Sequence, residues 1–72
     1  MYSFYSTVGE ILSHPEAARI MEELIPGATT SEKLELGWNF SLERLSQTPG
    51  GDFPEYMLQE LVRRLNEQLY PQ

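Results

Sequence analysis

The sequence contains one histidine, His14, and this residue is the first candidate for acid-base chemistry. A histidine transfers protons near neutral pH, but a catalytic histidine needs a nucleophile or an orienting partner within hydrogen-bond reach. No such partner is evident nearby in the sequence, and His14 directly precedes Pro15 at the expected start of a helix. We therefore interpret His14 as part of a helix start and expect no catalytic role for it.

The carboxylates and glycines also lack the spacing that catalysis or cofactor binding requires. Glu22 and Glu23 are neighbours, and neighbours on a helix point about 100° apart, so they do not form an acid-base pair. One histidine and no cysteine leave no ligand set for a transition metal. Gly50 and Gly51 lack the lysine of a phosphate-binding loop. The sequence predicts a protein that is not an enzyme and that has no metal site and no cofactor.

Three aromatic side chains, Trp38, Tyr56 and Tyr5, are the candidates for binding a ligand. A sugar can stack on exposed rings of this kind, whereas in a small protein large aromatic side chains supply much of the buried apolar surface. The core is the more frequent location for such side chains. An exposed groove that holds Trp38 together with Tyr56 or Tyr5 would indicate carbohydrate binding.

The charge of the chain argues against two classes of partner. The 72 residues carry a formal net charge of −6, and only two of the five basic residues, Arg63 and Arg64, are adjacent. Nucleic acids and anionic membranes both select basic surfaces. No segment approaches the length of a membrane span, and residues 1–6 lack the features of a secretory signal. We expect that the protein binds neither nucleic acid nor a membrane and that its location is cytoplasmic.

The elements that must position these residues are predicted to be helices, and the first two follow each other directly. Thr7 and Glu10 have the Thr-x-x-Glu spacing of a capping box. Ser13 and Glu16 repeat this spacing, with a proline between them in the first turn, where its missing N–H has no cost. The first helix should therefore end near Ser13, and the second should begin at once.

The second helix has one apolar face. Its members recur at steps of three and four residues and are Ala17, Ile20, Met21, Leu24 and Ile25. The helix should end at Pro26 and Gly27, because proline cannot continue the backbone ladder and glycine allows a positive φ in the turn.

A short third helix is predicted before Gly37. Residues 28–31 offer several possible caps, of which Thr29 has capping-box spacing with Glu32. We expect Leu34 and Leu36 to point inward. Gly37 should end this helix in the left-handed conformation that glycine adopts readily.

The residues that begin at Ser41 resemble the helix start at Thr7. In both places a hydroxyl residue is followed at once by an aliphatic residue, another aliphatic residue comes three positions later, and a proline follows. These features are typical of a degenerate repeat in which a short helix leads into a long helix.

The longest helix is expected after a flexible break at residues 48–51, with Asp52 and Glu55 as its cap. Its apolar stripe is formed by Met57, Leu58, Leu61, Val62, Leu65 and Leu69. On its polar side, Glu60 is spaced to pair with the two arginines that follow it.

The apolar stripes of the second and fifth helices are expected to bury each other. A stripe that is not fully covered would offer surface to another protein or to a second copy of the chain. The fifth helix is the better candidate, because its stripe runs along its whole length. The candidate interaction surface comprises Leu58, Leu61, Leu65 and Leu69.

These elements predict an all-α fold, a compact orthogonal bundle of about five helices, two of them short. A chain of 72 residues has room for one domain. We place this domain at residues 7–70 and interpret residues 1–6 as an N-terminal arm or the end of a linker.

The assembled pattern resembles a small all-helical accessory domain that is appended to some bacterial glycoside hydrolases and related hydrolases. Residues 7–17 follow the pattern Thr-aliphatic-Gly-x-aliphatic-Leu-x-x-Pro-x-Ala, residues 24–27 contain the Pro-Gly helix end, and residues 37–45 follow Gly-x-x-x-Ser-Leu-x-x-Leu. The matched positions are caps, turns and core residues, which identify a fold better than an activity. The resemblance implies a noncatalytic module and carries over no functional residue.

The expected function is therefore that of a noncatalytic accessory or protein-interaction domain. Its partner would be a host-enzyme domain, another protein or a second copy of the chain. The alternative is a carbohydrate-binding accessory domain that uses exposed aromatic side chains. The chain is interpreted either as a free-standing protein or as a domain excised from a larger hydrolase.

Overall fold

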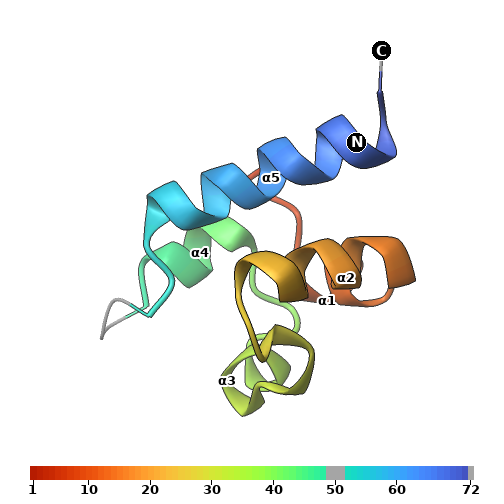
Figure 1. Ribbon diagram of the computed structural model, residues 1–72. Coiled ribbons are helices and arrows are strands. Elements are labelled where there is room, and N and C mark those ends of the chain that lie inside the picture. Colours follow the sequence, from red (N-terminus) through yellow and green to blue (C-terminus); the bar gives the residue numbers. More distant parts are fainter. Residues whose placement is uncertain (49–51, 72) are drawn as a thin grey trace.

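The computed structural model describes residues 1–48 and 52–71, and the secondary structure within them is helical (Figure 1). The elements are α1 (Val8–Leu12), α2 (Pro15–Leu24), the 3-10 turn η1 (Ala28–Thr30), α3 (Glu32–Leu36), α4 (Leu42–Ser46) and α5 (Glu55–Leu69). The radius of gyration is 11.0 Å, which agrees with about 11 Å for a compact domain of this length. The predicted all-α fold is confirmed, and three of the five α-helices in the described residues, rather than two, are short.

The starts of α1 and α4 lie side by side and exchange backbone hydrogen bonds. Thr7 and Ser41 form an isolated antiparallel bridge at this point. The N–H groups of Val8, Gly9, Leu42 and Glu43 donate to the carbonyl oxygens of Phe40, Trp38, Ser6 and Phe4, at 3.0, 2.8, 3.0 and 2.9 Å, respectively. The first N–H groups of a helix have no partner within that helix. Here the segment before each helix supplies acceptors to the other helix.

The two helix starts are equivalent in their side chains as well. The Thr7 hydroxyl accepts the Glu10 N–H and the Ser41 hydroxyl accepts the Arg44 N–H, both at 3.1 Å. Val8 and Leu42, the first residues of the two helices, are both fully buried. Each short helix then leads into a long one, α1 into α2 and α4 into α5. The predicted helix-pair repeat thus has a structural counterpart in the equivalent contacts at the two helix starts.

Residues 1–6, expected to be an arm or the end of a linker, contact the helical body along most of their length. Phe4 and Ser6 provide carbonyl acceptors to α4. The Tyr2 N–H donates to Asn66 Oδ1, and the Asn66 side-chain amide donates to the Tyr2 carbonyl, both at 2.9 Å. The edge of the Tyr2 ring also meets the Tyr70 ring, with 6.2 Å between centroids. The domain therefore begins no later than Tyr2. Both termini lie near the C-terminal end of α5, on the side away from α3 (Figure 1).

The core lies between α2 and α5, with α1 and α4 packed against them, as the two apolar stripes predicted. The fully buried side chains include Val8, Ile11, Ala17, Ile20, Met21, Leu34, Leu42, Leu58, Leu61 and Leu65. The predicted interaction surface on α5 is wrong, because Leu58, Leu61 and Leu65 have no exposed surface in this fold. Leu69 is partly buried and packs against the same core.

The predicted cap of α2 is corrected by one residue, and the structure selects one of the possible caps of α3. The cap of α2 is His14, whose Nδ1 accepts the Ala17 N–H at 3.3 Å, whereas Ser13 ends α1. The reason is local, because a residue before proline is forced into the extended conformation that a cap needs. Among the several caps that residues 28–31 offered to α3, the structure uses Ser31, whose hydroxyl accepts the Leu34 N–H.

Predictions for the glycine turns, for the cap of α5 and for the break before α5 can each be compared with the structure. Gly27 has a φ of 88°, as predicted, whereas Gly37 ends α3 at a φ of −93° and is not left-handed. Asp52 does not cap α5, which begins after Pro54 without a side-chain cap, and Asp52 instead pairs with Lys33. The flexible break predicted at residues 48–51 falls mostly outside the described residues.

We expect Leu61→Ala to lower the free energy of unfolding by about 2–5 kcal/mol, because it leaves a cavity between α5 and α2. That loss approaches the whole stability of a domain of this size. The matched control is Leu36→Ala, which removes the same side chain from an exposed helical position and should change the free energy of unfolding by less than about 0.5 kcal/mol. Urea denaturation followed by circular dichroism measures both, and equal effects would contradict the described core.

Candidate functional site

Leu36 is the most exposed large apolar side chain that the structure describes, with 87% of its surface accessible. It lies at the end of α3, whereas Leu34 of the same helix is fully buried. The prediction that both leucines point inward is therefore wrong for Leu36. The sequence did hold a signal, because residues two apart on a helix do not share a face.

An apolar hollow of about 260 Å³ lies beside Leu36. Its lining consists of Lys33, Leu36, Gly37, Phe40, Leu45, Thr48 and Phe53. Leu45 and Phe53 are almost completely buried, with 4% and 8% of their surfaces exposed. Lys33 forms an ion pair with Asp52. We call this feature the apolar hollow; no pattern in the sequence indicated it, because its lining comes from four separate segments.

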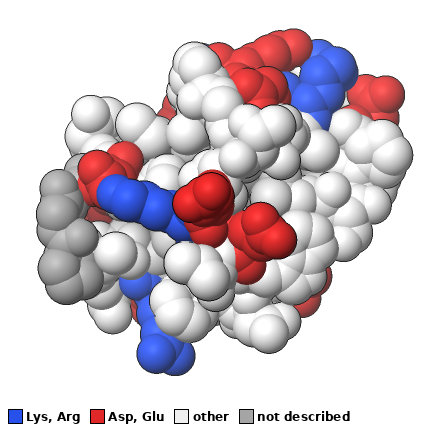
Figure 2. All heavy atoms as spheres, turned by 90° about the horizontal axis from the view of Figure 1, so that it is seen from below, with Lys and Arg blue, Asp and Glu red and all other residues white. Residues whose placement is uncertain are grey.

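Charged groups border the apolar hollow on two sides. Glu32, Glu35 and Leu36 line an adjoining open depression. Among the ion pairs of the described residues, none includes Glu32 or Glu35. On the other side, the Arg44 guanidinium lies over the Phe40 ring, 4.3 Å from its centroid. Figure 2 views the end of the molecule that carries α3, where a band of acidic and basic side chains crosses a largely uncharged surface.

A second hollow, of about 350 Å³, lies next to Trp38. Its lining consists of Leu12, Ala28, Thr29, Thr30, Ser31, Glu35 and Trp38. The indole ring lies directly against Gly9, since a Cβ atom there would be 2.4 Å from Trp38 Nε1. Trp38 keeps 42% of its surface exposed. The ring thus rests on the backbone of α1 and remains open to the hollow.

Internal hydrogen bonds already use the hydroxyl groups of Thr29, Thr30 and Ser31 beside the Trp38 hollow. The Thr29 hydroxyl donates to the Glu22 carboxylate at 2.8 Å, and the same carboxylate accepts the N–H groups of Thr29 and Gly27. These bonds, those from Thr29 first, lower the pKa of Glu22. Ser31 caps α3 with its hydroxyl. The threonines and Glu22 therefore shape the turn after α2.

The structure exposes the three predicted ligand aromatics but does not bring them together. Tyr5 and Tyr56 are 70% and 76% exposed. Tyr5 lies in the segment before α1, and Tyr56 lies in the first turn of α5. Neither residue is part of the lining of the Trp38 hollow. The Trp38 hollow therefore does not combine the indole with either tyrosine, as a shared carbohydrate-binding groove would require.

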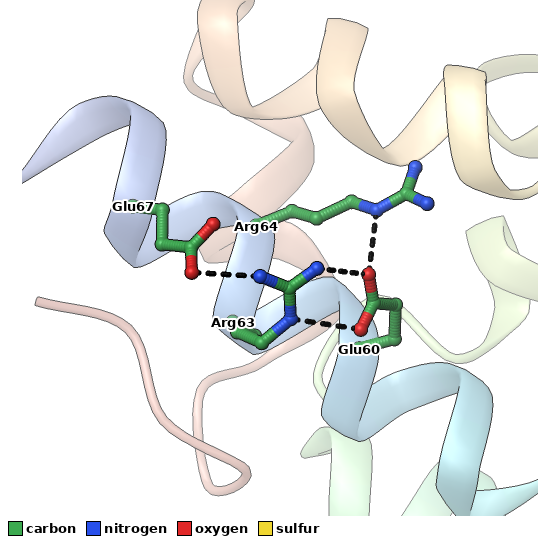
Figure 3. Close-up of polar contacts among 4 residues, drawn as sticks. All are labelled: Glu60, Arg63, Arg64 and Glu67. Atoms are coloured by element: carbon green, nitrogen blue, oxygen red, sulfur yellow. Dashed lines mark hydrogen bonds and ion pairs between the residues drawn. The ribbon is translucent and has the colours of Figure 1, made fainter.

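The largest carboxylate pKa shift lies on the solvent side of α5, away from both hollows. Arg63 donates to Glu60 from Nε at 2.9 Å and from Nη2 at 2.5 Å, and Arg64 Nε donates to it at 2.9 Å (Figure 3). Arg63 also donates to Glu67 at 2.7 Å. The bonds from Arg63 first, then those from Arg64, lower the pKa of Glu60 to about 2. The predicted pairing of Glu60 with both arginines is confirmed, and the Glu67 contact was missed.

The remaining candidates have simple structural positions. His14 is 3.3 Å from the N–H that it caps and lines neither hollow. Within residues 1–48 and 52–71, no group of three or more His, Asp or Glu side chains is arranged to hold a metal ion. None of the described helices is both long enough and apolar enough to cross a bilayer.

Comparisons with protein-family models, curated proteins and solved structures find no match for this chain. The resemblance to hydrolase accessory domains therefore stays a prediction. The candidate site rests on the geometry around Leu36 alone.

We expect Gly9→Ala to displace the Trp38 ring, because the new Cβ atom would lie 2.4 Å from Nε1. Replacing a helical glycine with alanine ordinarily stabilises a helix by about 1 kcal/mol, and this gain should be absent or reversed. The fluorescence of Trp38, the one tryptophan, should shift to longer wavelength. Gly37→Ala is the control, because its Cβ would approach no closer than 3.4 Å. An unchanged spectrum for Gly9→Ala would contradict the described packing.

We expect carbon-13 NMR titration of Glu60 to give a pKa of about 2 in the folded protein, against an ordinary value of 4.5. Because folding lowers this pKa, the stabilising contribution of Glu60 is complete above about pH 4.5 and is lost as the pH falls through about 2. Arg63→Met should raise the pKa more than Arg64→Met, since the contacts from Arg63 have the larger effect. Equal shifts in the two variants would refute the described geometry.

Proposed function

We propose that this chain is a noncatalytic accessory domain that binds another protein through the surface around Leu36. We define the Leu36 surface by Glu32, Glu35, Leu36, Phe40 and Phe53. The observation that carries the proposal is the 87% exposure of Leu36 directly beside the apolar hollow. A single exposed leucine is ordinary on a protein surface. Here, however, Leu36 can insert into a partner, and the apolar hollow beside it can receive a side chain of that partner.

The energetics support this placement. Complete burial of a leucine side chain is worth about 1.5–3 kcal/mol, and Leu36 contributes almost none of this to folding. Three of the leucines of α5, Leu58, Leu61 and Leu65, are fully buried in the core, and Leu69 is partly buried against it. The interaction function predicted from the sequence is therefore assigned to α3 instead of α5.

The position of α3 also suits an appended domain. Both termini lie away from α3 (Figure 1). A partner bound at the Leu36 surface would leave the chain ends free for attachment to a host. Attachment to a bacterial hydrolase rests on the sequence resemblance alone. A cytoplasmic location belongs to the same proposal, since a fold without cysteine needs no oxidising compartment.

Carbohydrate binding is the second candidate function, and the half-exposed Trp38 ring in its hollow favours it. It has less support than protein binding, because neither Tyr5 nor Tyr56 lines that hollow. The hydroxyl groups of Thr29 and Ser31 are also engaged in internal hydrogen bonds.

We expect a photo-crosslinking amino acid in place of Leu36 to join the domain to one specific protein in its native cells. The same amino acid in place of Arg19, an exposed residue of α2, should give no such product. The cross-linked protein is identified by mass spectrometry, purified and titrated against the domain, and Leu36→Ser should abolish binding while circular dichroism stays unchanged.

The proposal fails if position 36 gives no product, or if positions 36 and 19 give the same products. Light scattering of the purified domain separates a second copy from a different protein. A sugar bound at Trp38 would leave the crosslinker at position 36 without a protein partner, so the same experiment also separates the two candidate functions.

A further inference from the structure

We propose that the Leu36 surface binds a segment with one large apolar anchor side chain and lysine or arginine residues on the α3 side of that anchor. This inference rests on the proposed function and adds the chemistry of the partner. It follows from three properties of the described residues, namely the size of the apolar hollow, the unpaired carboxylates of α3 and the position of Arg44.

The apolar hollow is sized for a side chain. Its volume of about 260 Å³ lies below the range of roughly 300–1,000 Å³ that is typical of small-molecule sites. Phe53 and Leu45 are nearly buried there, and Phe40 is partly buried. Interfaces obtain most of their binding energy from a few side chains that enter such recesses. One leucine-, methionine- or phenylalanine-sized anchor therefore fits this site.

The α3 side of the hollow selects positive charge. Glu32 and Glu35 border Leu36 in the adjoining depression, and no ion pair neutralises either carboxylate within the described part of the chain. Lys33 does not compensate them, because Asp52 is its partner. A segment anchored in the apolar hollow must pass Leu36 to reach these carboxylates, so its basic residues lie next to the anchor.

Arg44 gives the bound segment a direction. Its guanidinium lies over Phe40. It lines a depression that meets the apolar hollow at Phe40 and Thr48, whereas the depression of Glu32 and Glu35 meets the hollow at Leu36. A basic residue placed there would meet a like charge, which opposes binding. The basic residues of the segment therefore lie toward α3 and not toward α4. The net charge of −6 also attracts a basic partner at long range and increases its association rate.

The test titrates synthetic amphipathic peptides into the intact domain labelled with nitrogen-15. One peptide carries a leucine anchor with lysines beside it, a second has glutamates in place of the lysines, and a third has the lysines but an alanine anchor. We expect the first peptide to shift the amide signals of the Leu36 surface and to bind at least about tenfold more tightly than the other two. Its affinity should fall as the salt concentration rises.

Variants of the domain separate the contributions. The double variant Glu32→Gln with Glu35→Gln should lower the affinity for the lysine peptide by about three- to tenfold, as expected for the loss of exposed ion pairs. Leu36→Ser should remove its binding. Glu16→Gln with Glu23→Gln is the matched charge control, because it removes two exposed carboxylates of α2 outside the Leu36 surface, and it should not weaken binding. Circular dichroism of each variant establishes that the fold is retained.

Three results would overturn the inference. They are equal binding of the lysine and glutamate peptides, binding that is unaffected by Leu36→Ser, and no binding of any peptide at millimolar concentration. Each of these results is compatible with a protein partner cross-linked at position 36. The proposed function would then stand, but the partner would have a different chemistry. The absence of a cross-linked partner would instead refute the proposed function itself.

Discussion

The reciprocal hydrogen bonds between the starts of α1 and α4 are the constraint on which the rest of this fold depends. Each helix start has N–H groups without intrahelical acceptors, and the chain before the other helix accepts them. This exchange holds residues 1–6 in the domain and aligns the two helix pairs. It thereby brings α2 against α5, where the core of a chain without cysteine must form.

The packing of the two helix pairs explains where apolar surface is left over. The pairs α1 with α2 and α4 with α5 bury their stripes against each other, so neither long helix keeps an apolar face for a partner. Helix α3 lies in the connection between the two pairs. It buries Leu34 to stay attached and leaves Leu36 in solvent. The connection therefore carries the apolar side chain that folding does not use.

The charged side chains are divided in a similar way. On the solvent face of α5, Arg63 and Arg64 form a closed network with Glu60, which lowers the pKa of that carboxylate (Figure 3). Such exposed pairs within one helix contribute little to stability. The carboxylates of Glu32 and Glu35 on α3 have no such partner among the described ion pairs. The acidic surface near Leu36 is therefore available to groups outside the chain.

The sequence by itself determined the helices and much of their capping, because periodicity, caps and prolines act over a few neighbouring residues. The box of Thr7 and Glu10, the turn at Gly27 and the burial of α2 against α5 follow from such local patterns. Even the cap at His14 was readable from the proline after it. Tertiary structure decided the rest. The pairing of residues 4–6 with α4 and the hollow beside Leu36 join segments far apart in the chain, and no local rule states which distant carbonyl or ring will be adjacent.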